Sequence, residues 1–198
     1  MNLLEKSLNV CRVFEELEVE TQEFLSQSQL TCFKGCGNCC TNPRVSASVL
    51  EFLPLAFDIY RSGKAEDTIA LLSTSSEESY CIMLKKLSID ADVGQCTNYA
   101  NRGLICRLFA SSARRNKHGE KELLTCRKIK EGKKELFEAA TEAIQTKMDV
   151  PLSSDYYTRL YGIDFNLANE QLTINTAIRK ALEAVLTFYY YSEEGNAV

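Results

Sequence analysis

Cysteines are the residues of this chain whose type and spacing could do chemistry. Nine occur among its 198 residues, and four of them fall within nine residues. That first group is Cys32, Cys36, Cys39 and Cys40. A second group at wider intervals is Cys81, Cys96, Cys106 and Cys126. Packing needs alone do not place thiols so densely, so these eight residues are predicted metal ligands.

The spacing of the first group is C-x3-C-x2-C followed directly by a fourth cysteine. This spacing lets a short loop direct the sulfurs of Cys32, Cys36 and Cys39 at one point. Side chains of adjacent residues usually point apart, so Cys40 is expected to serve another site, a second iron of a cluster, or a structural role. Thiolates are soft ligands that favour zinc, copper(I) and iron–sulfur iron over calcium or magnesium.

Eight cysteines leave the number of metal sites open. They could hold two tetrahedral metals or two clusters, or one cluster surrounded by spare thiols. Zinc commonly uses two C-x2-C pairs, which this arrangement lacks, and the thiols exceed the needs of one zinc ion. We therefore expect an iron–sulfur cluster of the 4Fe-4S type, with zinc as the alternative.

The compartment is expected to be the cytoplasm. The first twenty residues lack a basic region followed by an apolar one, so no secretory signal is visible. No stretch approaches the ~18 apolar residues of a membrane span, and no membrane association is expected. An odd number of cysteines in a reducing compartment argues against a disulfide framework.

Apolar periodicity predicts a mostly α-helical fold with little β-structure, in which a helical shell surrounds an irregular cysteine-rich centre. We expect a single domain over 1–198, with an N-terminal helix (1–30), a cysteine-cluster core (31–130) and C-terminal helices (131–198). Individual helices are predicted over 3–28, about 64–73, about 136–148 and about 169–191.

Local signals refine this prediction. Cys11 lies in the apolar stripe of the first helix, so we assign it to packing. Ser48 and Glu51 have the spacing of a capping box, and Pro54 should divide the helix that follows. The apolar run around Cys126 suggests a strand, preceded by a turn at 116–119.

Four cysteine elements occur in an order that resembles the YkgJ-type cysteine-cluster family, which carries a zinc- or iron-chelating CxxCxxCC domain. They are the first group, then Cys81-Ile-Met-Leu, then the stretch from Cys96 through Tyr99 and Arg102 to Cys106-Arg107-Leu-Phe109, and finally Cys126. The resemblance covers about residues 30–130. Two departures occur: three residues separate Cys32 from Cys36 instead of two, and Gly103 replaces the usual proline.

The resemblance implies metal binding, for electron transfer or metal handling. One branch of the family includes flagellin lysine N-methylases, so an iron–sulfur and S-adenosylmethionine-dependent enzyme is an alternative. Radical S-adenosylmethionine enzymes share the cysteine spacing, but their loop follows a strand of a barrel of ~250 residues. A zinc-stabilised interaction module is a third candidate.

Charged residues point to cofactor contacts but to no catalytic group. Arg102 and Arg107 are expected to offset the charge of a thiolate cluster or to receive an anionic substrate. His118 is the only histidine and lies in the predicted turn, so Ser–His–Asp catalysis is not expected. The net charge of −4 and the lack of a recognisable module argue against nucleic-acid binding. The expected partner is an unidentified protein or small molecule.

Overall fold

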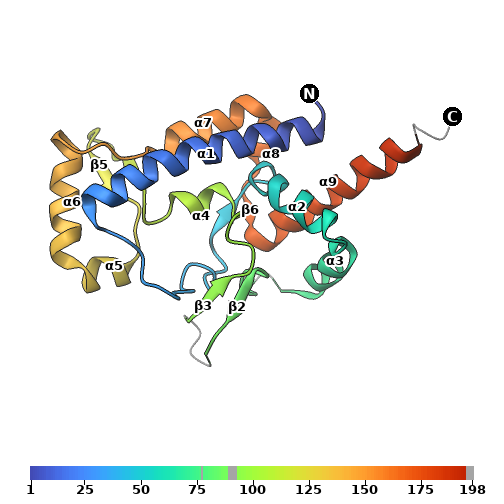
Figure 1. Ribbon diagram of the computed structural model, residues 1–198, viewed down its shortest axis with the longest axis horizontal. Coiled ribbons are helices and arrows are strands. Elements are labelled where there is room, and N and C mark those ends of the chain that lie inside the picture. Colours follow the sequence, from blue (N-terminus) through green and yellow to red (C-terminus); the bar gives the residue numbers. More distant parts are fainter. Residues whose placement is uncertain (77, 89–92, 195–198) are drawn as a thin grey trace. The chain divides into compact units, whose positions relative to one another are not determined.

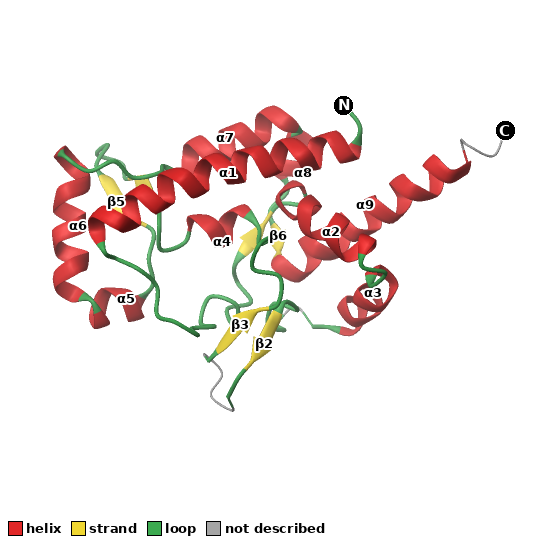
Figure 2. Cartoon of the chain, viewed as in Figure 1, coloured by secondary structure: helices red, strands yellow, loops and turns green. Residues whose placement is uncertain are grey.

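The computed structural model describes residues 1–76, 78–88 and 93–194, and the described chain is mostly helical with short strands (Figures 1 and 2). The predicted fold class is confirmed. The α-helices are α1 (Leu3–Ser28), α2 (Leu53–Arg61), α3 (Ala65–Thr74), α4 (Leu104–Leu108), α5 (Arg127–Gly132), α6 (Lys134–Thr146), α7 (Ser153–Ile163), α8 (Phe165–Asn169) and α9 (Ile174–Glu194). The strands are β1 (Ser46–Ala47), β2 (Leu84–Lys86), β3 (Gly94–Cys96), β4 (Ala113–Arg115), β5 (Lys121–Leu123) and β6 (Leu172–Thr173). No helix in these ranges is long and apolar enough to cross a membrane.

The first helix, α1, forms because an apolar stripe and a reciprocal cap agree. Val10 and Phe14, four residues apart on that stripe, are both buried. At its start, the backbone N–H of Glu5 donates to Asn2 Oδ1 at 2.9 Å, and the backbone N–H of Asn2 donates to Glu5 Oε2 at 2.8 Å. The bounds of α1 confirm the helix predicted over 3–28.

The segment after the cysteine loop begins with the predicted capping box. The backbone N–H of Ser48 donates to Glu51 Oε1 at 2.7 Å, and Ser48 Oγ lies 3.1 Å from the same oxygen. A short 3-10 turn over Leu50–Phe52 follows, and α2 then starts with Pro54 in its first turn. Proline is tolerated there because the first N–H groups of a helix have no intrahelical partner. Pro54 therefore divides the helical segment as predicted.

Two compact units make up the chain, and each combines separated stretches of sequence. The first contains residues 1–11, 35–103 and 160–198, and the second contains 12–34 and 104–159. The expected single-domain organisation stays a prediction.

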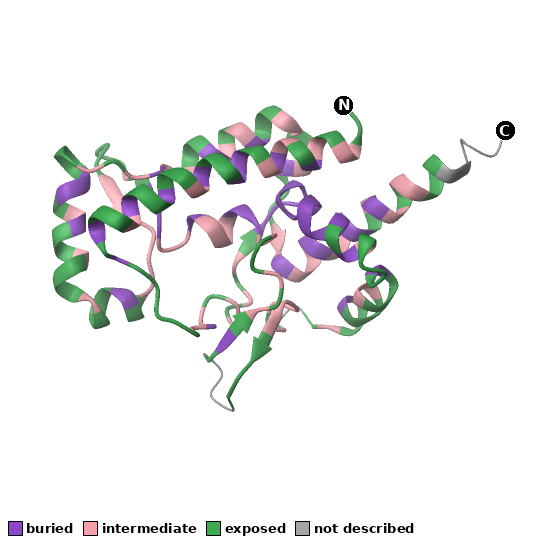
Figure 3. Cartoon of the chain, viewed as in Figure 1, coloured by how far each residue is buried: buried purple, intermediate pink, exposed green. Residues whose placement is uncertain are grey.

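In the first unit, α2 packs against α9. Buried residues gather along α2 (Figure 3). The rings of Tyr60 and Tyr189 stack with centroids 4.1 Å apart, and Phe57 meets Tyr189 edge-on at 6.1 Å. These aromatic contacts fix α9 against α2.

Two small sheets of the first unit position the cysteine segments. Strands β1 and β6 pair antiparallel, with Ser46 opposite Thr173, and so join the end of the cysteine loop to the start of α9. Strands β2 and β3 form an antiparallel hairpin in which Leu84 lies opposite Cys96.

Small hydrophobic clusters lie among the buried residues of the second unit. One cluster contains Phe24, Ala113 and Ile144, and another contains Leu30, Ile129 and Ala140. Strands β4 and β5 form a hairpin over the predicted turn, closed by a 3.0 Å hydrogen bond from the backbone N–H of Gly119 to the carbonyl of Asn116.

Two predicted elements differ from the structure. Strand β5 ends at Leu123, and Cys126 is the extended residue that precedes α5, so the strand predicted around Cys126 is wrong. Short apolar runs suit either a strand or a buried helix, and here Ile129 is a buried helical residue. The helix predicted from residue 169 starts at Ile174, because β6 pairs with β1 just before it.

Candidate metal centre

Four thiols of the first unit interact electrostatically: Cys36, Cys40, Cys81 and Cys96. Burial raises the pKa of the Cys40 thiol, and the neighbouring Cys96 and Cys36 raise it further. Burial also raises the pKa of Cys81 to about 12, against a backbone hydrogen bond from Met83, and Cys40 and Cys96 add to the increase. These interactions link the four thiols into one group.

Backbone hydrogen bonds bring the three segments of this group together. The N–H of Cys81 donates to the carbonyl of Cys40 at 2.9 Å, and the N–H of Gly94 donates to the carbonyl of Gly35 at 3.0 Å. Cys36 forms an antiparallel bridge with Val93, at the start of the strand that ends in Cys96. The cysteine loop is therefore held against the β2–β3 hairpin by main-chain contacts.

A turn directly after Cys36 carries Cys40, and Cys36 itself precedes the turn in its bridge with Val93. The N–H groups of Cys40 and Thr41 both donate to the carbonyl of Gly37, at 2.9 and 3.2 Å. The bridge of Cys36 to Val93 and the hydrogen bond from Cys81 to Cys40 hold both ends of this segment next to the β2–β3 hairpin.

Glycines allow the loop and the hairpin to approach closely. A Cβ atom on Gly37 would lie 3.0 Å from Leu84 Cδ1 and 3.3 Å from the backbone nitrogen of Gly94. A Cβ atom on Gly94 would lie 2.9 Å from the carbonyl oxygen of Lys85. A side chain at either position would push the cysteine segments apart.

Main-chain donors and one arginine favour the thiolate form within the group. The Cys81 sulfur accepts a backbone hydrogen bond from Met83. Burial raises the pKa of Cys96, while a backbone hydrogen bond from Asn98 and the positive charge of Arg102 act in the opposite direction. N–H donors to sulfur are what a metal-bound thiolate uses to spread its negative charge.

The donor set fits a soft metal. Burial raises the pKa of Cys40, Cys81 and Cys96 and so favours their neutral thiol form, and a cation bound among the sulfurs would reverse that balance and hold them as thiolates. In the described part of the chain, no three Cys, His, Asp or Glu side chains already stand close enough to share one ion. The group is thus defined by electrostatic proximity and main-chain contacts, and its side chains are not arranged in a finished coordination shell.

Residues 31–142 match the CxxCxxCC family, described as a putative zinc- or iron-chelating domain. The match spans more than half of the 198 residues. The protein belongs to this family. Its membership supports metal binding and leaves the choice between zinc and iron open. Comparison with curated proteins and with solved structures finds no match.

The remaining candidate ligands of this CxxCxxCC protein belong to both units. Cys39 is exposed in the first unit, and none of the nine cysteines forms a disulfide. Cys32, Cys106 and Cys126 belong to the second unit, where Cys126 packs against the Leu30 cluster. Metal ligation by these four residues stays a prediction.

The two candidate cofactor arginines have different surroundings. In the first unit, the Arg102 guanidinium lies 3.8 Å from the Tyr99 ring centroid and acts electrostatically on Cys96. In the second unit, Arg107 lies 4.5 Å from the Phe14 ring centroid, and its Nη1 is 3.6 Å from Glu18 Oε2. Arg102 can therefore offset thiolate charge, whereas these contacts of Arg107 anchor it to α1. His118 is exposed in the β4–β5 turn.

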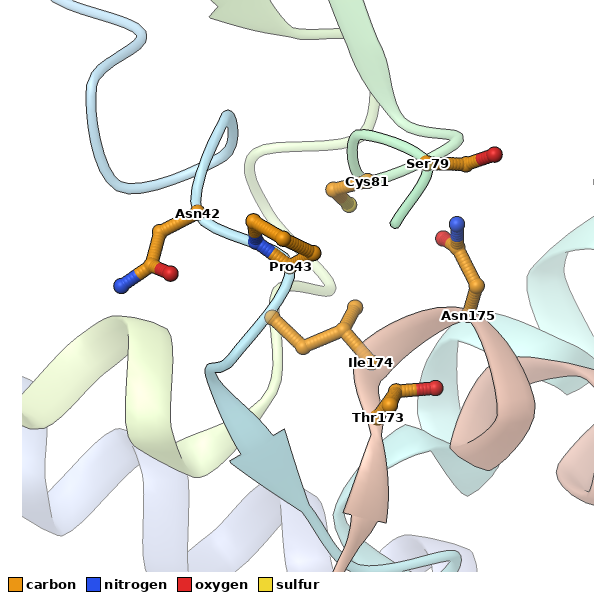
Figure 4. A pocket seen from close by; sticks show the side chains of 7 residues that line it. All are labelled: Asn42, Pro43, Ser79, Cys81, Thr173, Ile174 and Asn175. Carbon is orange, nitrogen blue, oxygen red and sulfur yellow. The ribbon is translucent and has the colours of Figure 1, made fainter. Parts of the chain in front are cut away.

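A small cavity adjoins the thiol group and has room for about one water molecule (Figure 4). It is lined by Asn42, Pro43, Ser79, Cys81, Thr173, Ile174 and Asn175. Sequence reasoning missed Asn175, because this residue lies far from every cysteine along the chain and no motif marks it. The local spacing of the loop predicts that Cys36 converges with Cys32 and Cys39, whereas the hydrogen bond between Cys81 and Cys40 depends on segments far apart in sequence.

Proposed function

We propose that this protein binds a 4Fe-4S cluster through Cys36, Cys40, Cys81 and Cys96, and uses it in electron transfer or metal handling. The observation that carries the proposal is the set of main-chain contacts that brings these four cysteines together from three chain segments, and the electrostatic interaction of their thiols supports it. Four soft sulfur donors can ligate all four irons of such a cluster.

A full set of thiolate ligands favours electron transfer or scaffolding over catalysis at an open iron. Catalytic metal sites keep one position free for substrate, whereas four protein ligands close the site. The cavity beside Cys81 holds about one water molecule, too little for a cofactor such as S-adenosylmethionine. Thiolate ligation also needs reduced cysteines, so the proposal places the protein in a reducing compartment such as the cytoplasm.

Structural zinc is the second candidate, and one observation favours it. Cys81 and Cys96 each accept a hydrogen bond from the backbone of the residue two positions later, Met83 and Asn98. Such tight turns with N–H donors to sulfur suit the closed four-thiolate shell of a structural zinc ion. In that case the metal would hold together an interaction module.

Anaerobic purification followed by iron, zinc and acid-labile sulfide analysis distinguishes these functions. A 4Fe-4S protein should be brown, absorb broadly near ~400 nm and contain about four irons and four sulfides per chain. A colourless protein with stoichiometric zinc and no sulfide would overturn the cluster proposal and support the zinc-stabilised interaction module. A protein that binds neither metal would refute both. Purification in air is unsuitable, because oxygen destroys clusters and zinc can then occupy the thiols.

A further inference from the structure

The side chain of Asn175 makes a pair of hydrogen bonds around Cys81. Asn175 Nδ2 donates to the carbonyl of Tyr80 at 2.9 Å, and the backbone N–H of Ile82 donates to Asn175 Oδ1 at 2.9 Å. Figure 4 shows the Asn175 amide directed at the loop that carries Cys81. One amide therefore holds the main chain on both sides of a candidate metal ligand.

The backbone of Cys81 itself is also fixed on both sides. Its N–H donates to the carbonyl of Cys40 at 2.9 Å, and its carbonyl accepts from the N–H of Leu84 at 2.9 Å. With the Asn175 bonds, hydrogen bonds restrain the main chain from Tyr80 to Ile82. Rotation about χ1 remains as the principal freedom of the thiol.

Asn175 belongs to a closed circuit of contacts within the first unit. It lies in the first turn of α9, directly after β6. Strand β6 pairs with β1, which follows the loop that carries Cys40. A path of contacts thus leads from Cys40 along the chain to β1, across the strand pairing to β6, and on to Asn175, which binds the chain around Cys81. The hydrogen bond from the N–H of Cys81 to the carbonyl of Cys40 closes this circuit.

The two hydrogen bonds of Asn175 start from a helix that is itself packed in the first unit. Helix α9 packs against α2, with Tyr189 stacked on Tyr60 further along. A side chain that bridges a rigid helix to a ligand-bearing loop restricts the directions in which the ligand can move.

We infer that Asn175 is a positioning residue that orients the Cys81 sulfur for metal binding. This inference rests on the proposed four-thiolate site. Asparagine suits the role because a single amide offers both a donor and an acceptor, and the paired bonds to Tyr80 and Ile82 use one of each.

The test compares Asn175→Ala with Arg179→Ala and Asn175→Gln. Arg179 is a matched control on the same helix, where its Nε lies 3.8 Å from Glu183 Oε1 on the surface. Each protein is loaded anaerobically, and transfer of its iron or zinc to a coloured chelator is timed. Loss of a residue that orients a ligand typically costs 10–100-fold in metal affinity, so Asn175→Ala should release its metal about 10–100-fold faster. Arg179→Ala should match the wild type, and Asn175→Gln, which keeps both amide functions, should recover part of the retention.

A second readout needs no metal. In the metal-free protein, hydrogen exchange at the Ile82 amide should be slow in the wild type and fast in Asn175→Ala, because that amide loses its acceptor. If Asn175→Ala does not fold, Asn175→Leu, which has a similar size but neither amide donor nor acceptor, takes its place, and unchanged release and exchange in that folded variant would overturn the inference.

The outcomes separate the inference from the proposed function. A wild-type protein that binds no stoichiometric metal overturns the proposed function. A wild type that binds metal, with equal release rates for Asn175→Ala and the wild type, overturns only the role of Asn175. Equally fast release from Asn175→Ala and Arg179→Ala would also overturn it, since loosening of α9 would then explain both.

Discussion

The backbone N–H of Cys81 donates to the carbonyl oxygen of Cys40 at 2.9 Å. This hydrogen bond joins two thiol-bearing residues from distant parts of the chain without using either thiol. The main chain of the candidate centre is thus assembled by ordinary peptide contacts. Metal binding then needs side-chain rotation more than backbone rearrangement, which lowers the ordering cost of binding.

Replacing Cys81 by serine should abolish stoichiometric metal binding. A serine hydroxyl is a harder, weaker ligand than a thiolate, and the loss leaves three sulfurs in the group. Metal binding is coupled to folding, so the melting temperature of the loaded protein should fall as well. Metal analysis and thermal unfolding of the anaerobic protein measure both effects, and Cys36→Ser should behave in the same way.

Cys11→Ala is the control for the cysteine variants. Cys11 lies in the first eleven residues of the first unit as a partly buried residue of α1. Its replacement should leave the metal content unchanged and lower stability by about 1 kcal/mol or less. Equal metal loss in Cys11→Ala and Cys81→Ser would mean that the thiol group has been wrongly delimited.

A methyl group at Gly94 should open the contact between the hairpin strands. The added Cβ would lie 2.9 Å from the Lys85 carbonyl oxygen and 2.7 Å from Leu84 Cδ1. The backbone oxygen can move only by disturbing the β2–β3 pairing, so Gly94→Ala should cost roughly 1–3 kcal/mol. Because Cys96 ends the same strand, the variant should also retain metal less well.

Gly162→Ala is the matched control for this substitution. Apart from the neighbouring residues and backbone of its own helix, no atom of the described residues lies within 4 Å of a Cβ built on Gly162, which lies inside α7. Alanine is the better helix former, so this variant should gain up to about 1 kcal/mol and keep its metal. Thermal unfolding and metal content are measured for Gly94→Ala and Gly162→Ala. A Gly94→Ala protein as stable as the wild type would contradict the close approach of Gly94 to Lys85 and Leu84.

The sequence predicted features that depend on local pattern and missed those that depend on distant contacts. Helix α1 follows from apolar periodicity, and the cap between Ser48 and Glu51 follows from a four-residue motif. The partnership of Cys40 with Cys81 depends on main-chain hydrogen bonds between segments far apart in sequence. No local signal marks Asn175, because its function depends on where β6 places the start of α9.

Asp58 should support the Cys96 turn from α2. Asn98, whose backbone donates to the Cys96 sulfur, also donates from Nδ2 to Asp58 Oδ2 at 2.6 Å. Removing this acceptor in Asp58→Ala should speed metal release by about 2–10-fold, less than removal of Asn175, because Asp58 acts through a second side chain. Asp58→Asn keeps an oxygen acceptor and should release metal at nearly the wild-type rate. The rates of metal transfer to a chelator from the two variants and the wild type test this prediction. Release from Asp58→Ala at the wild-type rate would show that Asp58 does not support the site.

Asp164 should make stability depend on pH. Burial opposes ionisation of its carboxyl, but hydrogen bonds from Lys6 and the backbone N–H of Leu167, together with the Lys6 charge, outweigh burial and lower its pKa. Lys6 Nζ lies 2.6 Å from Asp164 Oδ2, and Leu167 N donates to Oδ1 at 2.9 Å as the cap of α8.

A group whose pKa is lowered by folding stabilises the native state above its unfolded pKa and loses that contribution as pH falls through its folded pKa. The unfolded pKa of an aspartate is about 3.9. Asp164→Asn keeps a capping oxygen and removes the charge, so it should be about 1 kcal/mol less stable than the wild type at pH 7. The difference should shrink below about pH 4. Denaturant unfolding of both metal-free proteins at pH 7 and pH 3 measures it, with Glu138→Gln in an exposed pair with Lys134 as the control expected to change little at either pH. A difference between Asp164→Asn and the wild type that stays constant across this range would show that the ionised carboxylate is not its source.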